Sequence, residues 1–92
     1  MLALKSSALY RKDFKRIVRR GLNTTLLRDV IQQLREQKPL AQNHKDHPLK
    51  GRYAGLRECH IQPDWLLIYE LDGENLVLTT TRTGTHDDLG LE

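Results

Sequence analysis

The hydrophobic pattern of this chain changes its period once, and that change limits the fold more than any other feature. From Ser7 to Lys38 apolar residues recur at helical spacing, whereas from Arg57 onward they alternate or run together as in strands. The stretch from Trp65 to Leu71 is almost wholly apolar, which is typical of a central strand covered on both faces. A helical block followed by a strand block predicts the α+β class.

Two amphipathic helices are expected before residue 40. The first begins at Ser7 and stops at Gly21, because glycine favours helix ends. Asn23 can cap the second helix, and Pro39 ends it just after Lys38. The short connection between the helices implies an antiparallel pair. Their apolar stripes are expected to be core, at Tyr10, Phe14, Ile17, Val18, Leu26, Leu27, Val30, Ile31 and Leu34.

A short first strand is expected at Leu2–Leu4, and three more follow a loop at Leu40–Ala54. The order β-α-α-β-β-β places both helices on one face of a small, mostly antiparallel sheet. The second face is either shallowly exposed or partly shielded by that loop and the tail. In the last strand, simple alternation would put Leu78 and Arg82 on one face. The later strands are expected at Arg57–Ile61, Trp65–Leu71 and Leu76–Thr83.

Size and composition indicate one domain over residues 1–92 with a thin core. Met1–Lys5 does not resemble a signal peptide, and no apolar run approaches the ~20 residues that span a bilayer. The single cysteine, Cys59, cannot form an internal disulfide. We therefore expect a cytoplasmic protein with no membrane partner.

Positive charge is concentrated in the helical block. Through Leu40 there are ten basic and three acidic residues, a net charge of +7, whereas the remainder carries −4. One interpretation is a surface for a polyanion such as nucleic acid, a ribosome or an acidic protein. The other is a solvated helix face. If the surface binds an acidic partner, charge reversal at Arg16 and Arg19 should weaken that binding.

Three of the four histidines lie beside turns or strand ends, at His47, His60 and His86. RNA cleavage through its own 2′-hydroxyl needs a group that removes a proton, a cation at phosphorus and an acid for the leaving oxygen. These histidines, with Asp64 and Arg82, have the required chemistry, and it needs no metal.

Each candidate also has a structural interpretation, such as a capped loop or a half-buried strand residue. Trp65 is either core or a platform on which a base stacks. Arg57 and Glu58 pair with Arg82 or His60, or lie on the surface. A metal site built from His44, His47, His60 and His86 is not favoured, because paired CxxC spacing is absent. His44 is expected at the surface, and no metal or other cofactor is expected.

Three segments together resemble the YafQ branch of the RelE/ParE toxin superfamily: Asp46–Gly51, Arg57–Tyr69 and Arg82–His86. The resemblance covers about residues 45–89, and the two basic helices suit the family layout. It implies a RelE-like microbial ribonuclease fold. It also implies the toxin of a bacterial type II toxin–antitoxin pair, a metal-independent endoribonuclease that cuts mRNA on ribosomes and leaves a cyclic phosphate.

The resemblance assigns catalytic roles to His47, His60, Asp64 and His86, with His86 favoured as general acid and His47 or His60 as base. Arg82 matches an arginine near the scissile phosphate. The expected RNA-binding set is completed by Lys50, Arg57 and Trp65.

The tail departs from the family pattern, because Gly90 stands where an aromatic residue is expected. Asp87 and Asp88 add negative charge beside the expected RNA site, so activity is expected to be reduced. Leu91 and Glu92 have the character of a non-native addition. The implied partners are mRNA on the ribosome, ribosomal RNA and a DinJ- or RelB-like antitoxin with a ribbon-helix-helix half and an acidic tail. The alternative is a non-catalytic, ParE-like inhibitor of DNA gyrase on the same fold.

Overall fold

The computed structural model describes residues 1–91, and it confirms the α+β order with additions in the loop and tail. The expected elements are β1 (Ala3–Ser6), α1 (Ala8–Arg19), α2 (Thr24–Arg35), β3 (Arg57–Gln62), β4 (Trp65–Asp72) and β5 (Val77–Gly84). The additions are β2 (His47–Pro48), α3 (His86–Leu89) and two single 3₁₀ turns, η1 (Gln42–His44) and η2 (Gly51–Tyr53).

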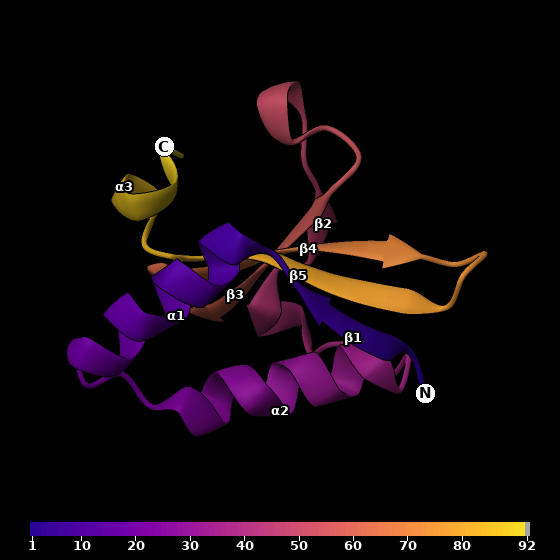
Figure 1. Ribbon diagram of the computed structural model, residues 1–92, viewed down its shortest axis with the longest axis horizontal. Helices are drawn as coiled ribbons and strands as arrows, with labels where there is room; N and C mark the ends of the chain where they lie inside the picture. Colours follow the sequence, from indigo (N-terminus) through magenta and orange to yellow (C-terminus); the bar gives the residue numbers. More distant parts are fainter. Residues whose placement is uncertain (92) are drawn as a thin grey trace.

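The five strands form one sheet in the order β1-β5-β4-β3-β2. β1 runs parallel to β5, and every other neighbouring pair is antiparallel. The sheet is therefore mostly antiparallel, as expected. Figure 1 shows α2 on one side of the sheet and α3 on the other.

The helices begin where their caps predict. The Ser7 hydroxyl accepts a bond from the Tyr10 amide at 2.9 Å, and the Asn23 side chain accepts one from the Thr25 amide at 3.0 Å. α2 ends at Arg35, three residues before the expected end, because Gln37 takes a left-handed conformation with φ 57°. None of the helices among the described residues is long and apolar enough to cross a membrane.

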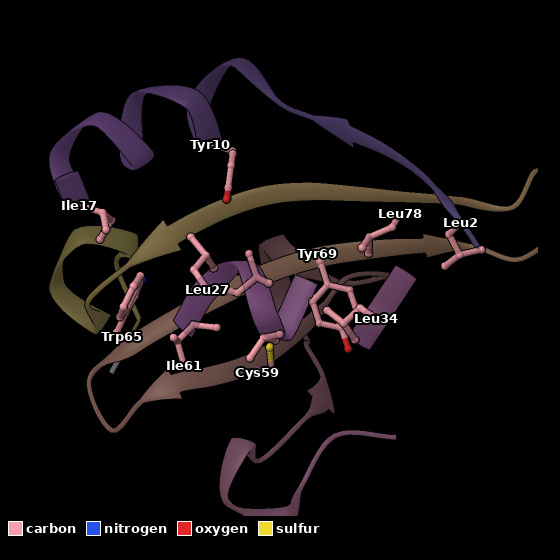
Figure 2. Packing of buried hydrophobic residues seen from close by; sticks show 12 residues of the cluster. Leu2, Tyr10, Ile17, Leu27, Leu34, Cys59, Ile61, Trp65, Tyr69 and Leu78 are labelled. Carbon is pink, nitrogen blue, oxygen red and sulfur yellow. The ribbon is translucent and has the colours of Figure 1, made fainter. Parts of the chain in front are cut away.

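The main core lies between the helices and one face of the sheet. Ile17 from α1, Leu27 from α2 and Leu67 and Tyr69 from β4 are almost fully buried there (Figure 2). At about 25 cal/mol per Å², this apolar burial is the main favourable contribution to folding. The prediction that the apolar stripes form core is thus confirmed, except that Val18 is exposed.

The second face is partly covered, so it is not open over its whole area. Leu66 and Ile68 of β4 are fully buried in a smaller cluster with Leu89 of α3. The loop contributes Leu49, Tyr53 and Leu56 to this cluster, and the tail contributes Leu91. Of the two expectations for this face, shielding by the loop and tail is confirmed.

The prediction that Arg82 shares a face with Leu78 is wrong, because β5 contains a bulge. Tyr69 pairs with Thr80, but the next residue of β4, Ile68, pairs with Arg82, so Thr81 is an extra residue. The bulge changes the alternation, and Arg82 therefore lies on the second face with its partner Ile68.

Candidate functional site

The sheet aligns three of the charged or titratable side chains in one row. His47 pairs with Glu58, Glu58 with Ile68, and Ile68 with Arg82, across β2, β3, β4 and β5. Directly paired residues point to the same side of a sheet, so all three charged groups lie on the second face. His60 pairs with Leu66, which belongs to the cluster on that face, and so lies on the same side.

Glu58 is the candidate site residue that sequence reasoning underrated. Its side chain is 7% exposed, and its Oε1 lies 3.3 Å from His60 Nε2 and 3.8 Å from His47 Nε2. A buried carboxylate must have a charged or hydrogen-bonding partner, and here two imidazoles supply it. The sequence signal was the spacing of Glu58 and His60, which puts both on one face of β3. Of the open alternatives, pairing with His60 is confirmed.

His86, near the C-terminal end of the sequence, lies beside His60. It is the first residue of α3, and its Nδ1 donates a 2.6 Å bond to Asp64 Oδ1. The His86 amide bonds the same oxygen at 3.1 Å. The His60 and His86 ring centroids are 5.8 Å apart with a 62° angle between the planes. The bonds from His86 lower the pKa of the Asp64 carboxyl below its usual value.

The loop histidines have different environments. His47 is about half exposed, and its Nδ1–H donates to the Lys45 carbonyl at 2.6 Å, which leaves Nε2 as the nitrogen that faces Glu58. His44 was expected at the surface, but it is partly buried in η1. Its Nδ1–H donates to the His60 carbonyl at 2.7 Å. His44 therefore supports the strand that carries His60.

Arg82 finds an anionic partner, although not among the acids that the sequence suggested. Its Nε and Nη2 donate to Asp13 at 2.8 and 3.0 Å, and the Thr83 amide donates to the same carboxylate at 3.2 Å. Asp13 is 2% exposed, so α1 holds a buried acid against the end of β5. The hydrogen bonds that Arg82 donates to Asp13 raise the pKa of Arg82, which stays charged, and Nη1 is not used by Asp13.

Arg57 supports the loop that carries His47. It donates two 3.3 Å bonds to Asp46, and the Tyr69 hydroxyl donates to Asp46 at 2.5 Å. Burial and the neighbouring Asp46 raise the pKa of Tyr69, which remains a donor. Lys50 is exposed, and its ammonium makes no ion pair among residues 1–91.

The alternative that Trp65 stacks on a base is wrong, because its side chain is core. Trp65 is 2% exposed, and its indole N–H donates to the Thr83 hydroxyl at 2.9 Å. A ring buried in this way has no free face for a nucleobase.

In the tail, the structure shows a partner for one of the two added acids and a structural role for Gly90. Asp88 accepts two bonds from Arg20, at 2.7 and 3.0 Å, and these lower the pKa of its carboxyl well below the usual range. Gly90 is the C-cap of α3 with φ 69°, a conformation that favours glycine. Leu91 packs on the smaller cluster, whereas Glu92 lies outside the described residues.

The groups that meet here also form a set of potential metal ligands. One ligand atom from each of Glu58, His60 and His86 lies within 4.8 Å of the others. This set replaces the four histidines considered from the sequence, since the Nδ1 of His44 is bonded to a carbonyl. The same groups can accept, hold and donate protons without a metal, which is the chemistry expected of a phosphodiester-cleaving site.

Comparison with known proteins matches this chain to a toxin family. Residues 2–90 match the family described as the bacterial toxin of type II toxin–antitoxin system, YafQ. The mRNA interferase toxin YafQ of Escherichia coli strain K12 is 38% identical over 84 residues, which cover 90% of this chain and 89% of that protein.

Solved structures agree with the family match. A crystal structure of a metal-bound toxin from Helicobacter pylori has a TM-score of 0.91 at 40% identity, covering 97% of this chain and 99% of that one. The toxin in the E. coli DinJ–YafQ toxin–antitoxin complex gives 0.86 at 37% identity, with 96% of both chains covered. These relatives give no support to the alternative of a ParE-like gyrase inhibitor. The chain belongs to the YafQ family of bacterial toxins from type II toxin–antitoxin systems.

Proposed function

We propose that this protein is an mRNA interferase, a ribosome-dependent and metal-independent endoribonuclease that acts in the cytoplasm. The observation that carries the proposal is the convergence of Glu58, His60, Asp64 and His86, from β3, the β3–β4 turn and α3. Membership of the YafQ family and the mRNA interferase among its relatives support the same activity.

The base side of the site consists of two imidazoles around one buried carboxylate. The Nε2 atoms of His60 and His47 lie 3.3 and 3.8 Å from Glu58. A nitrogen that takes the proton of the RNA 2′-hydroxyl becomes cationic, and Glu58 stabilises that cation. We keep His47 and His60 as alternative bases, since both face the same oxygen of Glu58.

The acid side is the pair formed by His86 and Asp64. Nδ1 of His86 donates to the Asp64 carboxylate, so in the imidazolium form of the ring the second proton is on Nε2, and that proton is the one available for transfer. The 2′-oxygen attacks phosphorus, the bond to the 5′-oxygen breaks, and Nε2 of His86 protonates that oxygen. The products are a 2′,3′-cyclic phosphate and a 5′-hydroxyl end.

Arg82 supplies the cation for the charge that develops on the phosphate oxygens. Two of its donors are held by Asp13, which fixes the plane of the guanidinium and leaves Nη1 for an anion. Lys50 and Arg57, next to the loop that carries His47, are proposed as further contacts to RNA phosphates. Such contacts position the strand rather than read its sequence.

The test is cleavage of mRNA by the purified protein on programmed ribosomes, in the presence of a chelator. We expect cleavage in wild type and a loss of about 10- to 100-fold in Glu58→Gln, which keeps the shape and removes the charge. Glu74→Gln, in the exposed β4–β5 turn, is the matched control. Unchanged cleavage in Glu58→Gln would remove Glu58 from the mechanism, and no cleavage by wild type would contradict the function.

We further propose that an acidic antitoxin tail and ribosomal RNA share a basic surface on α1, formed by Lys12, Lys15, Val18 and Arg19. All four side chains are exposed, and Lys15, Val18 and Arg19 line a shallow hollow with Phe14. The DinJ–YafQ complex among the relatives supports an antitoxin partner of this kind. Sharing one surface makes antitoxin and ribosome binding mutually exclusive.

Charge reversal tests this surface, but Arg16 is an unsuitable site for it. Arg16 lies 3.7 Å from both Asp13 and Asp88, so its reversal would disturb internal ion pairs. The variant Lys15→Glu/Arg19→Glu should slow association with the antitoxin, and added salt should reduce the difference from wild type. Arg28→Glu on α2 reverses one charge outside the surface and is compared with the single variants Lys15→Glu and Arg19→Glu. If Arg28→Glu slows association as much as each of them does, net charge alone is the cause.

A metal ion is a second candidate ligand of the same site. Glu58, His60 and His86 present ligand atoms within 4.8 Å of one another, and a similar H. pylori toxin is metal-bound. A bound cation would occupy the nitrogens that move protons, so copper or zinc ions should inhibit cleavage and a chelator should restore it. Activation of chelator-treated protein by the metal would contradict this role.

A further inference from the structure

A chain of ion pairs on α1 connects the two ends of the candidate site. Asp13 holds Arg82 of β5, and Arg16 lies 3.7 Å from both Asp13 and Asp88. Arg20, the C-cap of α1, forms a bidentate ion pair with Asp88, which is 68 residues away in the sequence. One helix therefore contacts both the strand that carries Arg82 and the short helix that begins with His86.

The Asp88 side chain is mostly buried and is fixed by several hydrogen bonds. Its side chain is 12% exposed and accepts from the Thr85 amide at 3.0 Å, while the Thr85 hydroxyl accepts from the Asp88 amide at 3.1 Å. A Cβ atom at Gly84 would lie 2.8 Å from Asp88 Oδ2, so this packing requires glycine there. One carboxylate thus caps α3 and ties it to α1.

His86 depends on this connection because little else orients the start of α3. The helix has only four residues, too few to be stable alone. At its far end, Leu89 is buried and its carbonyl accepts from Arg52 at 2.9 Å. At its near end, the contacts are the Asp88 network and the bonds of His86 to Asp64, which is itself exposed.

We propose that the ion pair of Arg20 with Asp88 is a positioning device, which holds α3 so that the His86 imidazole stays against Asp64 and beside His60. The inference rests on the proposed ribonuclease function for its effect on rate, but not for its effect on geometry. Arg20 and Asp88 are positioning residues that act through His86 and touch no substrate. The pair acts on kcat because a displacement of about 1 Å in a reacting group costs up to about 100-fold in rate.

The experiment compares Arg20→Gln, Arg20→Lys and Asp88→Asn with Arg28→Gln, which removes one positive charge from α2 and breaks no ion pair among the described residues. Cleavage on ribosomes gives kcat and KM, and nuclear Overhauser contacts between the His60 and His86 rings report their distance. We expect kcat to fall about 10- to 100-fold in Arg20→Gln and Asp88→Asn with unchanged KM. The contacts between the rings should weaken in both variants.

Two further comparisons separate positioning from a general charge effect. Arg20→Lys keeps the charge but cannot make the bidentate contact. Compared with Arg20→Gln, it should therefore recover part of kcat and part of the contact between the two rings. The double variant Arg20→Gln/Asp88→Asn should be no worse than Asp88→Asn alone, because Asp88→Asn already removes the interaction with Arg20. Strictly multiplicative losses would overturn the proposal, as would a raised KM with intact kcat and ring contact, which would make Arg20 an RNA contact.

The outcomes for the inference and for the function are distinguishable. If wild type does not cleave mRNA, the proposed function fails, but the ring contact still tests the positioning device. If wild type cleaves and Arg20→Gln keeps both its kcat and its ring contact, the positioning proposal fails and the function stands. The spectrum of the β-sheet amides verifies that each variant is folded.

Discussion

His60 and His86 meet in one site, yet β3 and α3 hold them by different means. β3 lies between β2 and β4, and its Cys59 is fully buried in the main core. α3 has four residues and is held by one buried side chain, Leu89, together with ion pairs and caps. A central strand orients its side chains by packing, whereas a single helical turn needs specific polar contacts to do so.

Because of this difference, removing His60 and removing His86 should have unequal effects on the stability of the protein. His60 sits against buried Glu58, and His86 sits against exposed Asp64. Removing the first imidazole leaves a buried carboxylate short of a partner, and removing the second leaves a carboxylate that water can solvate. Catalysis should therefore depend on both, and stability mainly on His60.

The largest effect is expected from replacing the histidines themselves. His60→Ala and His86→Ala should each lower ribosome-dependent cleavage by about 10²–10⁴-fold, because each removes a proton-transfer group. Thermal melting should show a lower Tm for His60→Ala and an almost unchanged one for His86→Ala. A similar loss of Tm in both variants would contradict the distinction between strand and helical turn.

A core substitution in each region comes next. Leu67 of β4 and Leu89 of α3 are both almost fully buried, in the main core and in the smaller cluster. Leu67→Ala should cost about 2–5 kcal/mol of unfolding free energy. Leu89→Ala should cost less by chemical denaturation but should strongly increase amide exchange in α3, since that turn can open locally. Equal global losses would show that α3 is part of the main cooperative unit.

The Asp88 carboxyl should make the docking of α3 depend on pH. Because the contacts with Arg20 lower its pKa in the folded protein, its stabilising effect is fully present above the unfolded value of about 3.9 and is lost progressively as pH falls from there through the lower pKa of the folded state. The methyl signals of Leu89 should therefore move toward those of an undocked turn in acid. Asp88→Asn should show this undocking already at neutral pH, and the same acid transition in that variant would assign it to another group.

The smallest effect is expected at the end of α3. Gly90 has φ 69°, and an added Cβ would lie 2.8 Å from Arg52 Nη2. Gly90→Phe should therefore cost about 1 kcal/mol in backbone strain and displace the flexible Arg52 side chain. Gly90→Ala is the matched control, because it introduces the strain without the ring. Cleavage that improves only in Gly90→Phe would show that an aromatic residue outweighs this strain.

The sequence was sufficient to predict the order of the four longer strands and two longer helices, and the meeting of His60 with His86. Period changes, caps and turns locate the elements, and strand order alone brings His60, Asp64 and His86 to one end of the sheet. The face of Arg82 was not predictable, because the extra residue Thr81 follows from pairing with β4 and not from a local pattern. Nor was its partner Asp13, which is 69 residues away and reaches the strand only through the packing of α1.

The capping of α3 was partly readable from the sequence. Thr85 and Asp88 have the spacing of a capping box, and both of its bonds are present. The expectation that Asp88 adds negative charge beside the RNA site did not use this spacing. Its pairing with Arg20, by contrast, could be found only once the fold had brought the end of α1 to the tail.

The parallel pairing of β1 with β5 also affects how the chain folds during synthesis. Ser6 and Thr80, which face each other across these strands, are 74 residues apart. β1 therefore cannot pair until β5 has been synthesised. Contacts this distant in sequence raise contact order and slow folding. A fragment that ends before β5 leaves α1 without the strand it packs on, and neither His86 nor Arg82 is yet in place. The candidate site would thus form only after β5 and α3 have both been synthesised.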